Sequence, residues 1–196
     1  MKQDYDAYTS EDKKVWQLLF QRQNRLIFKT ASDSFLDGIR KIGFNKENIP
    51  NFSRINKVLK TATGWKLSVV PGLIDNFTFF KLLKNKTFPA TTWFRTLNQI
   101  DYLEEPDMFH DVYGHVPLLT NSPFCKFLQG LSHIALKHIK NEEVIERIAR
   151  IYWYTVEFGL INVNKETKIY GAGILSSIGE SQFCLSDKAT HLQSAF

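Results

Sequence analysis

The sequence lacks the features that mark several large classes of protein. It contains no apolar run long enough to cross a bilayer, and its opening residues, MKQDYDAYTSEDKK, mix acidic and basic side chains, unlike a secretion signal. It contains only two cysteines, Cys125 and Cys184, whose separation fits no metal or redox motif. From these absences we expect a protein without a membrane partner in a reduced, cytoplasmic setting.

A concentrated basic segment is also missing, although the formal net charge is +5. Lysine and arginine occur in small groups beside apolar helical positions, and none of these groups interleaves with a nucleic-acid-binding motif. The groups are Lys13/Lys14, Arg40/Lys41, Lys81/Lys84/Lys86 and Lys137/Lys140. Such spacing predicts solvated helix faces, so we expect no nucleic-acid partner.

The sequence has instead a core-forming composition that is rich in rings. Of its 196 residues, 43% are hydrophobic and 14% are aromatic, with sixteen phenylalanines among them. This length suits one domain with room for a buried active site, and no repeat, low-complexity tract or linker divides it. We therefore expect residues 1–196 to form a single domain.

Helix signals dominate the chain. Apolar residues at helical spacing predict segments that begin near Ser10, Ser32, Asn51, Asp75, Pro123 and Glu142, the last of which reaches about Leu160, and a final helix over 177–184. Strand signals are short and cover 65–70, more weakly 91–95, and 169–170. The predicted fold class is mainly α with a few short β-strands (α+β).

The stretch EPDMFHDVYGHVP contains two histidines that we single out as metal ligands. On a straight α-helix, His110 and His115 would differ in direction by roughly 140°, too far apart for one metal ion. A helix that ends near Tyr113 would let Gly114 adopt an unusual backbone angle and turn His115 back toward His110. Pro117 would then prevent the helix from resuming.

Glu157 is the strongest candidate for a third ligand, because it lies inside the apolar stretch IYWYTVEFGL. A lone carboxylate there is costly to bury unless a metal or another partner neutralises it. Two histidines and one carboxylate are typical of non-haem Fe(II) oxygenases, and the same set also forms hydrolytic zinc sites. Spacing alone leaves iron, zinc and a site with no metal open. For His133, His138 and His191 we expect ordinary surface roles.

Three ordered motifs resemble the pterin-dependent aromatic amino acid hydroxylases. The motifs are EPDMFHDVYGHVPLL, IARIYWYTVEFGL and IYGAGILSSIGESQFCL, and the resemblance covers residues 65–187 without large gaps. Within that family the sequence is most similar to the compact bacterial phenylalanine hydroxylases. The resemblance implies a catalytic domain of that type, which uses Fe(II), tetrahydrobiopterin and O2 to hydroxylate L-phenylalanine to L-tyrosine in aromatic amino acid metabolism.

The resemblance also implies a role for particular residues. His110, His115 and Glu157 match the family's iron ligands. Arg95 and Ser176 match the contacts to the substrate carboxylate, for which an arginine fork is well suited. The aromatic substrate pocket is matched by Trp153 and Phe158, and the pterin site by Phe79, Ile74, Ala149, Tyr152 and Glu180. Pro106 and Asp107 are expected to shape the start of the helix that carries His110.

Several points stay open at the level of sequence. The alternatives in function are a tryptophan hydroxylase, a non-catalytic relative that binds pterin or an amino acid, and a zinc hydrolase. The sequence stops at Phe196, where family members usually continue, so we expect a catalytic domain shortened at its C-terminus. It has no room for the regulatory domain or the tetramerisation helix of the animal members, so we expect a monomer that acts on small molecules.

Overall fold

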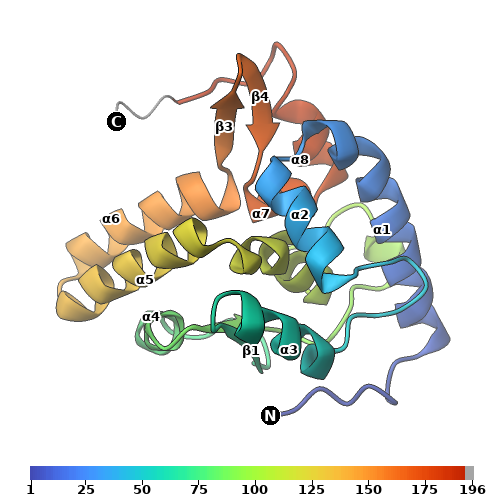
Figure 1. Ribbon diagram of the computed structural model, residues 1–196, viewed down its shortest axis with the longest axis horizontal. Helices are drawn as coiled ribbons and strands as arrows, with labels where there is room; N and C mark the ends of the chain where they lie inside the picture. Colours follow the sequence, from blue (N-terminus) through green and yellow to red (C-terminus); the bar gives the residue numbers. More distant parts are fainter. Residues whose placement is uncertain (193–196) are drawn as a thin grey trace.

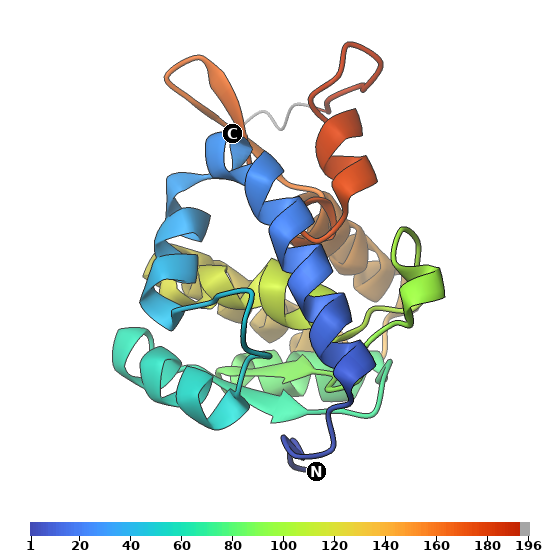
Figure 2. The ribbon, with the colours of Figure 1, turned by 90° about the vertical axis from the view of Figure 1, so that its right-hand side faces the viewer.

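The computed structural model of the protein describes residues 1–192. The longer helices are α1 (Ser10–Thr30), α2 (Asp33–Ile42), α3 (Phe52–Ala62), α4 (Asn76–Lys84), α5 (Ser122–Lys137) and α6 (Glu142–Tyr152), and the short ones are α7 (Ala172–Leu175) and α8 (Ile178–Phe183). Helices α5 and α6 lie side by side in Figure 1, and α1 crosses the front of the molecule in Figure 2. The predicted mainly α class is confirmed. Among the described residues, no helix is both long enough and apolar enough to cross a membrane.

Capping side chains set the starts of the predicted helices. Thr9, Ser32, Asn51 and Asp75 each accept a hydrogen bond from a backbone N–H in the first turn of the following helix, which satisfies a donor that the helix leaves free. Gly43 ends α2 in the left-handed conformation, with φ of 77°. These helix boundaries were predictable because each depends on residues that are close in sequence.

Two short sheets accompany the helices in residues 1–192. Strands β1 (Lys66–Val69) and β2 (Thr87–Ala90) pair in parallel across the intervening α4, and β3 (Leu160–Val163) pairs antiparallel with β4 (Glu166–Ile169). The strand expected over 91–95 is wrong, since the ladder ends at Ala90. Thr91 instead turns both its backbone N–H and its hydroxyl toward the carboxylate of Asp111, at 2.7 and 2.9 Å.

The metal-ligand candidates lie in two short π-helical segments rather than in regular α-helices. His110 and His115 belong to η2 (Phe109–His115), and Glu157 ends η4 (Trp153–Glu157), which directly continues α6. Hydrogen bonds in a π-helix join residues five apart, and such segments are frequent at functional sites. The wider turn brings residues five apart closer to one face than an α-helix does. It also ends the helical run at Glu157, so the helix expected to reach Leu160 is wrong.

The expected helix end at Tyr113 and the unusual backbone angle at Gly114 are therefore also wrong. Helical backbone continues through Gly114, and the glycines with positive φ among the described residues are Gly43 and Gly64. Gly114 is needed for a different reason, because a Cβ there would lie 2.9 Å from the carbonyl oxygen of Ala172 in α7. Pro117 does not stop the helical run either, because it lies in the first turn of the tighter 3₁₀ helix η3 (Val116–Thr120).

A cluster of aromatic rings packs η2 against α1 and α2. Phe109 and Tyr113 stack at 4.7 Å between ring centroids, and Trp16 of α1 meets the Phe109 ring at 5.5 Å. Phe20 and Phe35 pack edge-on against Tyr113. These rings belong to one hydrophobic core that joins α1, α2 and η2. Because this core packs against one side of η2, the side chains of the two histidines on the other side have a fixed direction.

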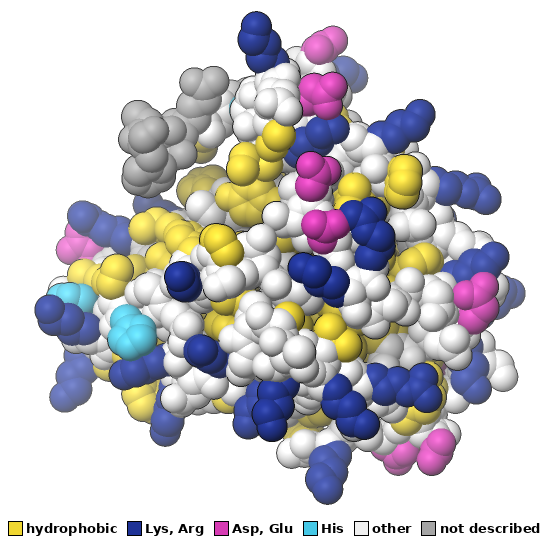
Figure 3. All heavy atoms as spheres, in the orientation of Figure 1, with side chains coloured by type: hydrophobic (Ala, Val, Ile, Leu, Met, Phe, Trp, Pro, Cys, Tyr) yellow, Lys and Arg dark blue, Asp and Glu magenta, His cyan; other side chains and the backbone are white. Residues whose placement is uncertain are grey.

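Exposed cations gather on one edge of the molecule. Figure 3 shows them along its lower edge, where α3, β1 and α4 lie. Between residues 48 and 100 the sequence has a single acidic residue, Asp75. The exposed cations in this stretch are Arg54, Lys57, Lys60, Lys66, Lys81, Lys84 and Lys86. The small basic groups are thus dispersed along the chain, as expected, but several of them are neighbours in space.

Candidate metal centre and active-site cavity

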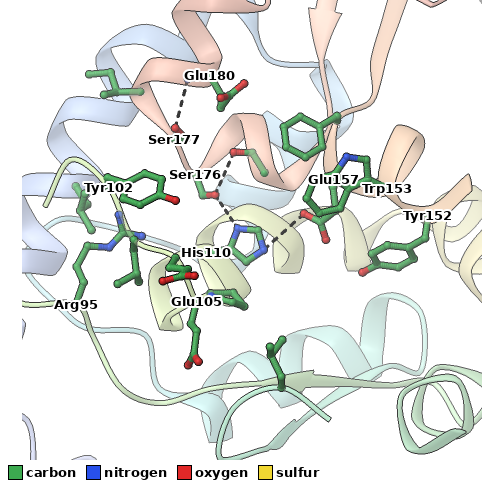
Figure 4. Close-up of a pocket in the computed structure, with 18 of the residues that line it drawn as sticks. Arg95, Tyr102, Glu105, His110, Tyr152, Trp153, Glu157, Ser176, Ser177 and Glu180 are labelled. Carbon is green, nitrogen blue, oxygen red and sulfur yellow. Dashed lines mark hydrogen bonds and ion pairs between the residues drawn. The ribbon is translucent and has the colours of Figure 1, made fainter. Parts of the chain in front are cut away.

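A cavity of about 780 Å³ opens between α1, α4, α6 and the α7–α8 segment. This volume is in the range of small-molecule sites. His110 and Glu157 line the cavity, and Figure 4 shows both side chains pointing into it. A smaller adjoining space of about 170 Å³ is lined by the same two residues and by His115. The three metal-ligand candidates therefore lie where the two spaces meet.

The three side chains converge on one point. The Nε2 atoms of His110 and His115 are 3.2 Å apart, and the Glu157 carboxylate lies 3.6 Å from the first and 3.2 Å from the second. One donor atom from each residue can be chosen so that all lie within 4.8 Å of one another. Ligands bound at about 2.1 Å to one ion are roughly 3 to 3.5 Å apart, so these separations suit a shared metal.

The electrostatics of the cluster also favour a cation. Burial lowers the pKa of His110 to about 4, against the opposing attraction of Glu157. Burial alone would raise the pKa of Glu157, but the charge and hydrogen bond of His115 outweigh it and lower that pKa to about 2. Without a metal, Nε2 of His115 can donate its proton to Glu157, and the carboxylate raises the pKa of this imidazole in spite of burial. A divalent cation accepts all three lone pairs at once, so the residues fit a metal.

An outer hydrogen bond fixes the tautomer of His110. The hydroxyl of Ser176 donates to the carbonyl oxygen of Ala172 at 2.8 Å and lies 2.9 Å from Nδ1 of His110. Since the hydroxyl has one hydrogen, Nδ1 must carry the proton and donate to Ser176. Nε2 of His110 then keeps its lone pair for a metal. Ser176, which was predicted to contact substrate, thus contacts a metal-ligand candidate.

Nδ1 of His115 is buried and has no hydrogen-bond partner in residues 1–192. Its ring packs against Phe88 with 4.8 Å between centroids. The tight packing leaves Nε2 as the atom that faces the cluster. His115 is consequently held by packing, whereas His110 is held by a hydrogen bond.

Arg95 lies at the cavity wall and is paired with a carboxylate that the sequence did not single out for this role. Its Nε and Nη2 atoms donate to the two oxygens of Asp107, at 2.8 and 3.0 Å. Asp107 is fully buried and also accepts a hydrogen bond from the backbone N–H of His110 at 3.1 Å. One edge of the Arg95 fork is therefore occupied, and the Nη1 end is left for a ligand. Asp107 does shape the helix start, as expected, and holds Arg95 as well.

Aromatic rings form two further parts of the wall. Trp153 and Phe158 lie 4.7 Å apart between centroids on one side, and Phe79 meets Tyr152 at 5.4 Å and 80° on another. Burial raises the pKa of the Tyr152 phenol well above its usual value, so the hydroxyl stays protonated. Ile74, Ala149 and Glu180, the other predicted contacts, also line the cavity. The structure thus brings every sequence-predicted site residue to this cavity or to the adjoining space.

Sequence reasoning missed the contribution of α1 and of the rim residues 100–106. Leu19, Arg22 and Gln23 of α1 line the cavity, as does the exposed Tyr102. Arg22 pairs with Asp101 at 2.6 Å and so ties the rim to α1. A buried glutamine among apolar helix positions was a usable signal, whereas the partner of Arg22 depends on the fold.

The sequence matches a known protein family. The family model described as "Biopterin-dependent aromatic amino acid hydroxylase" matches residues 4–195. The chain belongs to this family. Among curated hydroxylases, the phenylalanine-4-hydroxylase of Chromobacterium violaceum is 46% identical over 183 residues, which are 93% of this chain and 61% of that protein. The enzyme of Pseudomonas aeruginosa is 44% identical over 184 residues, with 94% and 70% covered.

Solved structures of hydroxylases in the family share the fold. The Chromobacterium violaceum phenylalanine hydroxylase with bound iron(III) and 7,8-dihydrobiopterin matches with a TM-score of 0.92 at 46% identity, over 95% of this chain and 68% of that chain. The iron- and phenylalanine-bound structure of the same hydroxylase matches with a TM-score of 0.89 at 44% identity, over 95% and 67%. This chain spans about three fifths of the first curated relatives, 61% and 59% of their lengths.

Proposed function

We propose that this hydroxylase-family chain binds one ferrous iron through His110, His115 and Glu157 and converts L-phenylalanine to L-tyrosine. Tetrahydrobiopterin is the proposed reductant, and O2 is the proposed cosubstrate. The observation that carries the proposal is the convergence of the three donor side chains at the inner end of a cavity that also presents Arg95. The names of the curated relatives support phenylalanine as the substrate.

Two neutral imidazoles and one carboxylate hold a metal while leaving part of its coordination sphere open. Iron and the reduced pterin would together supply the activation of O2 that ring hydroxylation requires. Ser176 keeps the lone pair of His110 directed at the metal position through its contact with Nδ1. A metal at this position would take over from His115 the role of holding the Glu157 carboxylate ionised.

The amino acid is bound at its two ends in this proposal. The Nη1 end of Arg95 would bind the α-carboxylate, with Asp107 holding the guanidinium in place from the opposite edge. Trp153 and Phe158 would stack on the aromatic side chain. A substrate held at both ends presents its ring toward the metal position in one orientation, which is how positioning contributes to rate.

The pterin would lie on the side of the cavity formed by α4 and α6. Phe79 offers a ring face there and is held edge-on by Tyr152, while Ile74 and Ala149 supply apolar contact. Glu180 supplies a carboxylate at the cavity wall. The largely apolar wall of the cavity would limit the access of water to the reacting groups.

A monomeric state and a cytoplasmic location also remain proposals. Both cysteines, Cys125 and Cys184, are free and buried, which supports a reducing setting. For the oligomeric state we propose a monomer. Size-exclusion chromatography with light scattering over a range of concentrations would test it, and a stable dimer would contradict it.

The test of the reaction uses the 196-residue chain loaded with Fe(II) without oxygen. Oxygen, tetrahydrobiopterin and phenylalanine are then added, and tyrosine is followed by chromatography. We expect tyrosine only when iron and pterin are both present. The matched control is chain loaded with Zn(II), which we expect to yield none.

The other outcomes separate the alternatives. Product from tryptophan but not from phenylalanine would make the chain a tryptophan hydroxylase. Tight iron binding without product from either amino acid would indicate a non-catalytic relative. Failure to bind iron at all would contradict the proposed iron site and with it the proposed function.

A further inference from the structure

Gln23 is an unusual residue for the place it occupies. It lies in α1 with 2% of its surface exposed, while the other buried residues of this helix are apolar. An amide buried without hydrogen bonds costs roughly 1 to 3 kcal/mol, so a buried glutamine is expected to have specific partners. The partners of Gln23 are far away in sequence, in the α7–α8 segment.

The amide nitrogen of Gln23 reaches three oxygen atoms of that segment. It donates to the hydroxyl of Ser181 at 2.7 Å and lies 3.4 Å from the carbonyl oxygens of Ile174 and Ser177. Ser181 is fully buried, and its hydroxyl donates in turn to the Ile174 carbonyl oxygen at 2.6 Å. Gln23 and Ser181 together therefore hold the carbonyl of Ile174 from two sides.

The segment held in this way carries outer contacts of two metal-ligand candidates. Ser176, which directly follows α7, accepts a hydrogen bond from Nδ1 of His110. Gly173 packs against Glu157, since a Cβ at this glycine would lie 3.1 Å from the carbonyl oxygen of Glu157 and 3.4 Å from its Oε2 atom. Ile174 lies between these two residues. A displacement of the Ile174 carbonyl would consequently move the partners of His110 and Glu157 together.

Helix α7 has little stability of its own to resist such a displacement. It contains four residues, Ala172–Leu175, which is a single turn, and isolated helices of that length do not persist in water. Its position must come from contacts with the rest of the molecule. On one side it packs against η2, and on the other the Gln23 amide and Ser181 hold it.

We propose that Gln23 is a positioning residue for the metal centre, acting through Ser181 and the α7 turn on His110 and Glu157. The inference rests on the proposed metal site, although not on the identity of the substrate. Outer hydrogen-bond partners of metal ligands typically change metal affinity by 10- to 100-fold. Gln23 acts one step further out, so we expect about a tenfold weakening of metal binding when its amide is removed.

The experiment titrates the full chain with Co(II) in the absence of oxygen and follows the visible absorption of the bound ion. Gln23→Met keeps the length of the side chain and removes the donor. We expect it to weaken Co(II) binding about tenfold and to shift the absorption band. Gln17→Met on the exposed face of the same helix is the matched control, with affinity expected within about twofold of the unmodified chain.

Two further variants separate positioning from general destabilisation. Ile27→Val trims the buried face of α1 one turn further along, so it should lower the melting temperature without changing Co(II) affinity. Ser181→Ala removes the hydroxyl that links the amide to the Ile174 carbonyl, and it should reproduce the Co(II) effect of Gln23→Met. It also serves as the test if Gln23→Met does not fold.

A double-variant comparison identifies the route of the effect. In a Ser176→Ala chain, one of the contacts through which Gln23 acts is already lost. Adding Gln23→Met to that chain should therefore weaken Co(II) binding by a clearly smaller factor than Gln23→Met does alone. Unchanged Co(II) affinity in both Gln23→Met and Ser181→Ala would overturn the inference while leaving the proposed function in place. Equal fold-changes with and without Ser176 would also overturn the proposed route. An unmodified chain that binds neither Co(II) nor Fe(II) would overturn both proposals.

Discussion

The metal-ligand cluster and the aromatic rim share one cavity, but the chain holds them in different ways. His115 and Glu157 are 4% and 12% exposed at their side chains, and core packing or hydrogen bonds fix each donor atom. Trp153 and Tyr102 at the rim are 55% and 78% exposed. The inner end is thus preorganised by residues of this chain, whereas the rim is only partly enclosed by residues 1–192. Substitutions at the inner end should therefore affect metal binding, and substitutions at the rim should affect substrate binding.

The largest effect is expected from Glu157→Gln. The amide removes the only negative charge among the three donors, so Fe(II) affinity should fall by more than about 100-fold, beyond the usual effect of an outer partner. The melting temperature of the metal-free protein should change little. Equilibrium dialysis against Fe(II) without oxygen measures the affinity, and unchanged iron retention would remove Glu157 from the ligand set.

Gly159→Ala tests how tightly the backbone behind the cluster is packed. A Cβ at this position would overlap the carbonyl oxygen of Thr155 and the ring of Tyr170, so the substitution should destabilise the fold by about 3 kcal/mol. Gly130→Ala in α5 is the control, because nothing lies within 4 Å of its Cβ position, and it should be neutral or stabilising by up to about 1 kcal/mol. Urea unfolding of both variants gives the values. Equal stabilities would show that the Gly159 region is not tightly packed.

Arg95→Lys tests the boundary between the inner end and the rim. Lysine cannot keep both contacts to Asp107 and also present a planar fork, so KM for phenylalanine should rise by roughly 10-fold or more. Iron affinity should stay within a few-fold of the unmodified chain. Steady-state kinetics at saturating pterin measures this, and an unaltered KM would argue against carboxylate binding by Arg95.

Trp153→Ala should affect only substrate binding at the rim. The ring is half exposed and contacts Phe158, so its loss should raise KM for phenylalanine by a few-fold, equivalent to about 1 kcal/mol of ring contact. Fe(II) affinity should be unchanged. A loss of iron from this variant, measured by the same dialysis, would show that rim and inner end are not independent.

The smallest effect concerns Tyr113, a residue of η2 that packs into the hydrophobic core. Its hydroxyl is buried without a partner in residues 1–192, and burial raises the pKa of its phenol above the usual 10.0. Above that pH the unfolded state loses the proton while the folded state keeps it, so stability falls as the pH rises. Tyr113→Phe should be neutral or stabilising by up to about 1 kcal/mol at pH 8 and should lose less stability at pH 10.5. Thermal melts at the two pH values check this, and a larger alkaline loss in the variant would contradict it.

The features that could be predicted from the sequence are those that depend on local interactions or on residue type. The helix caps at Thr9, Ser32, Asn51 and Asp75 were predictable because each is a local interaction. The donor residues of the cluster were predictable from residue type and context. The resemblance to the hydroxylase family over residues 65–187 supplied the predicted residues that line the cavity, but not those of α1.

The features that depend on distant contacts were not predictable. The π-helical turn of η2 places the two histidines, and it depends on packing of Gly114 against Ala172, far along the chain. The β3 strand was missed because its hairpin turns at Asn164 and Lys165, both with positive φ, instead of at a glycine. The bond between Gln23 and Ser181 joins residues 158 positions apart, and no local pattern reports it.

One measurement tests the central claim most directly. X-ray absorption spectroscopy of the chain loaded anaerobically with one equivalent of Fe(II) reports the atoms bound to the metal. We predict a six- or five-coordinate site with nitrogen and oxygen ligands only and scattering from two imidazole rings, which Glu157→Gln weakens or abolishes. Sulfur ligation, a single imidazole, or a spectrum unchanged by Glu157→Gln would contradict the assignment of His110, His115 and Glu157 as the iron site.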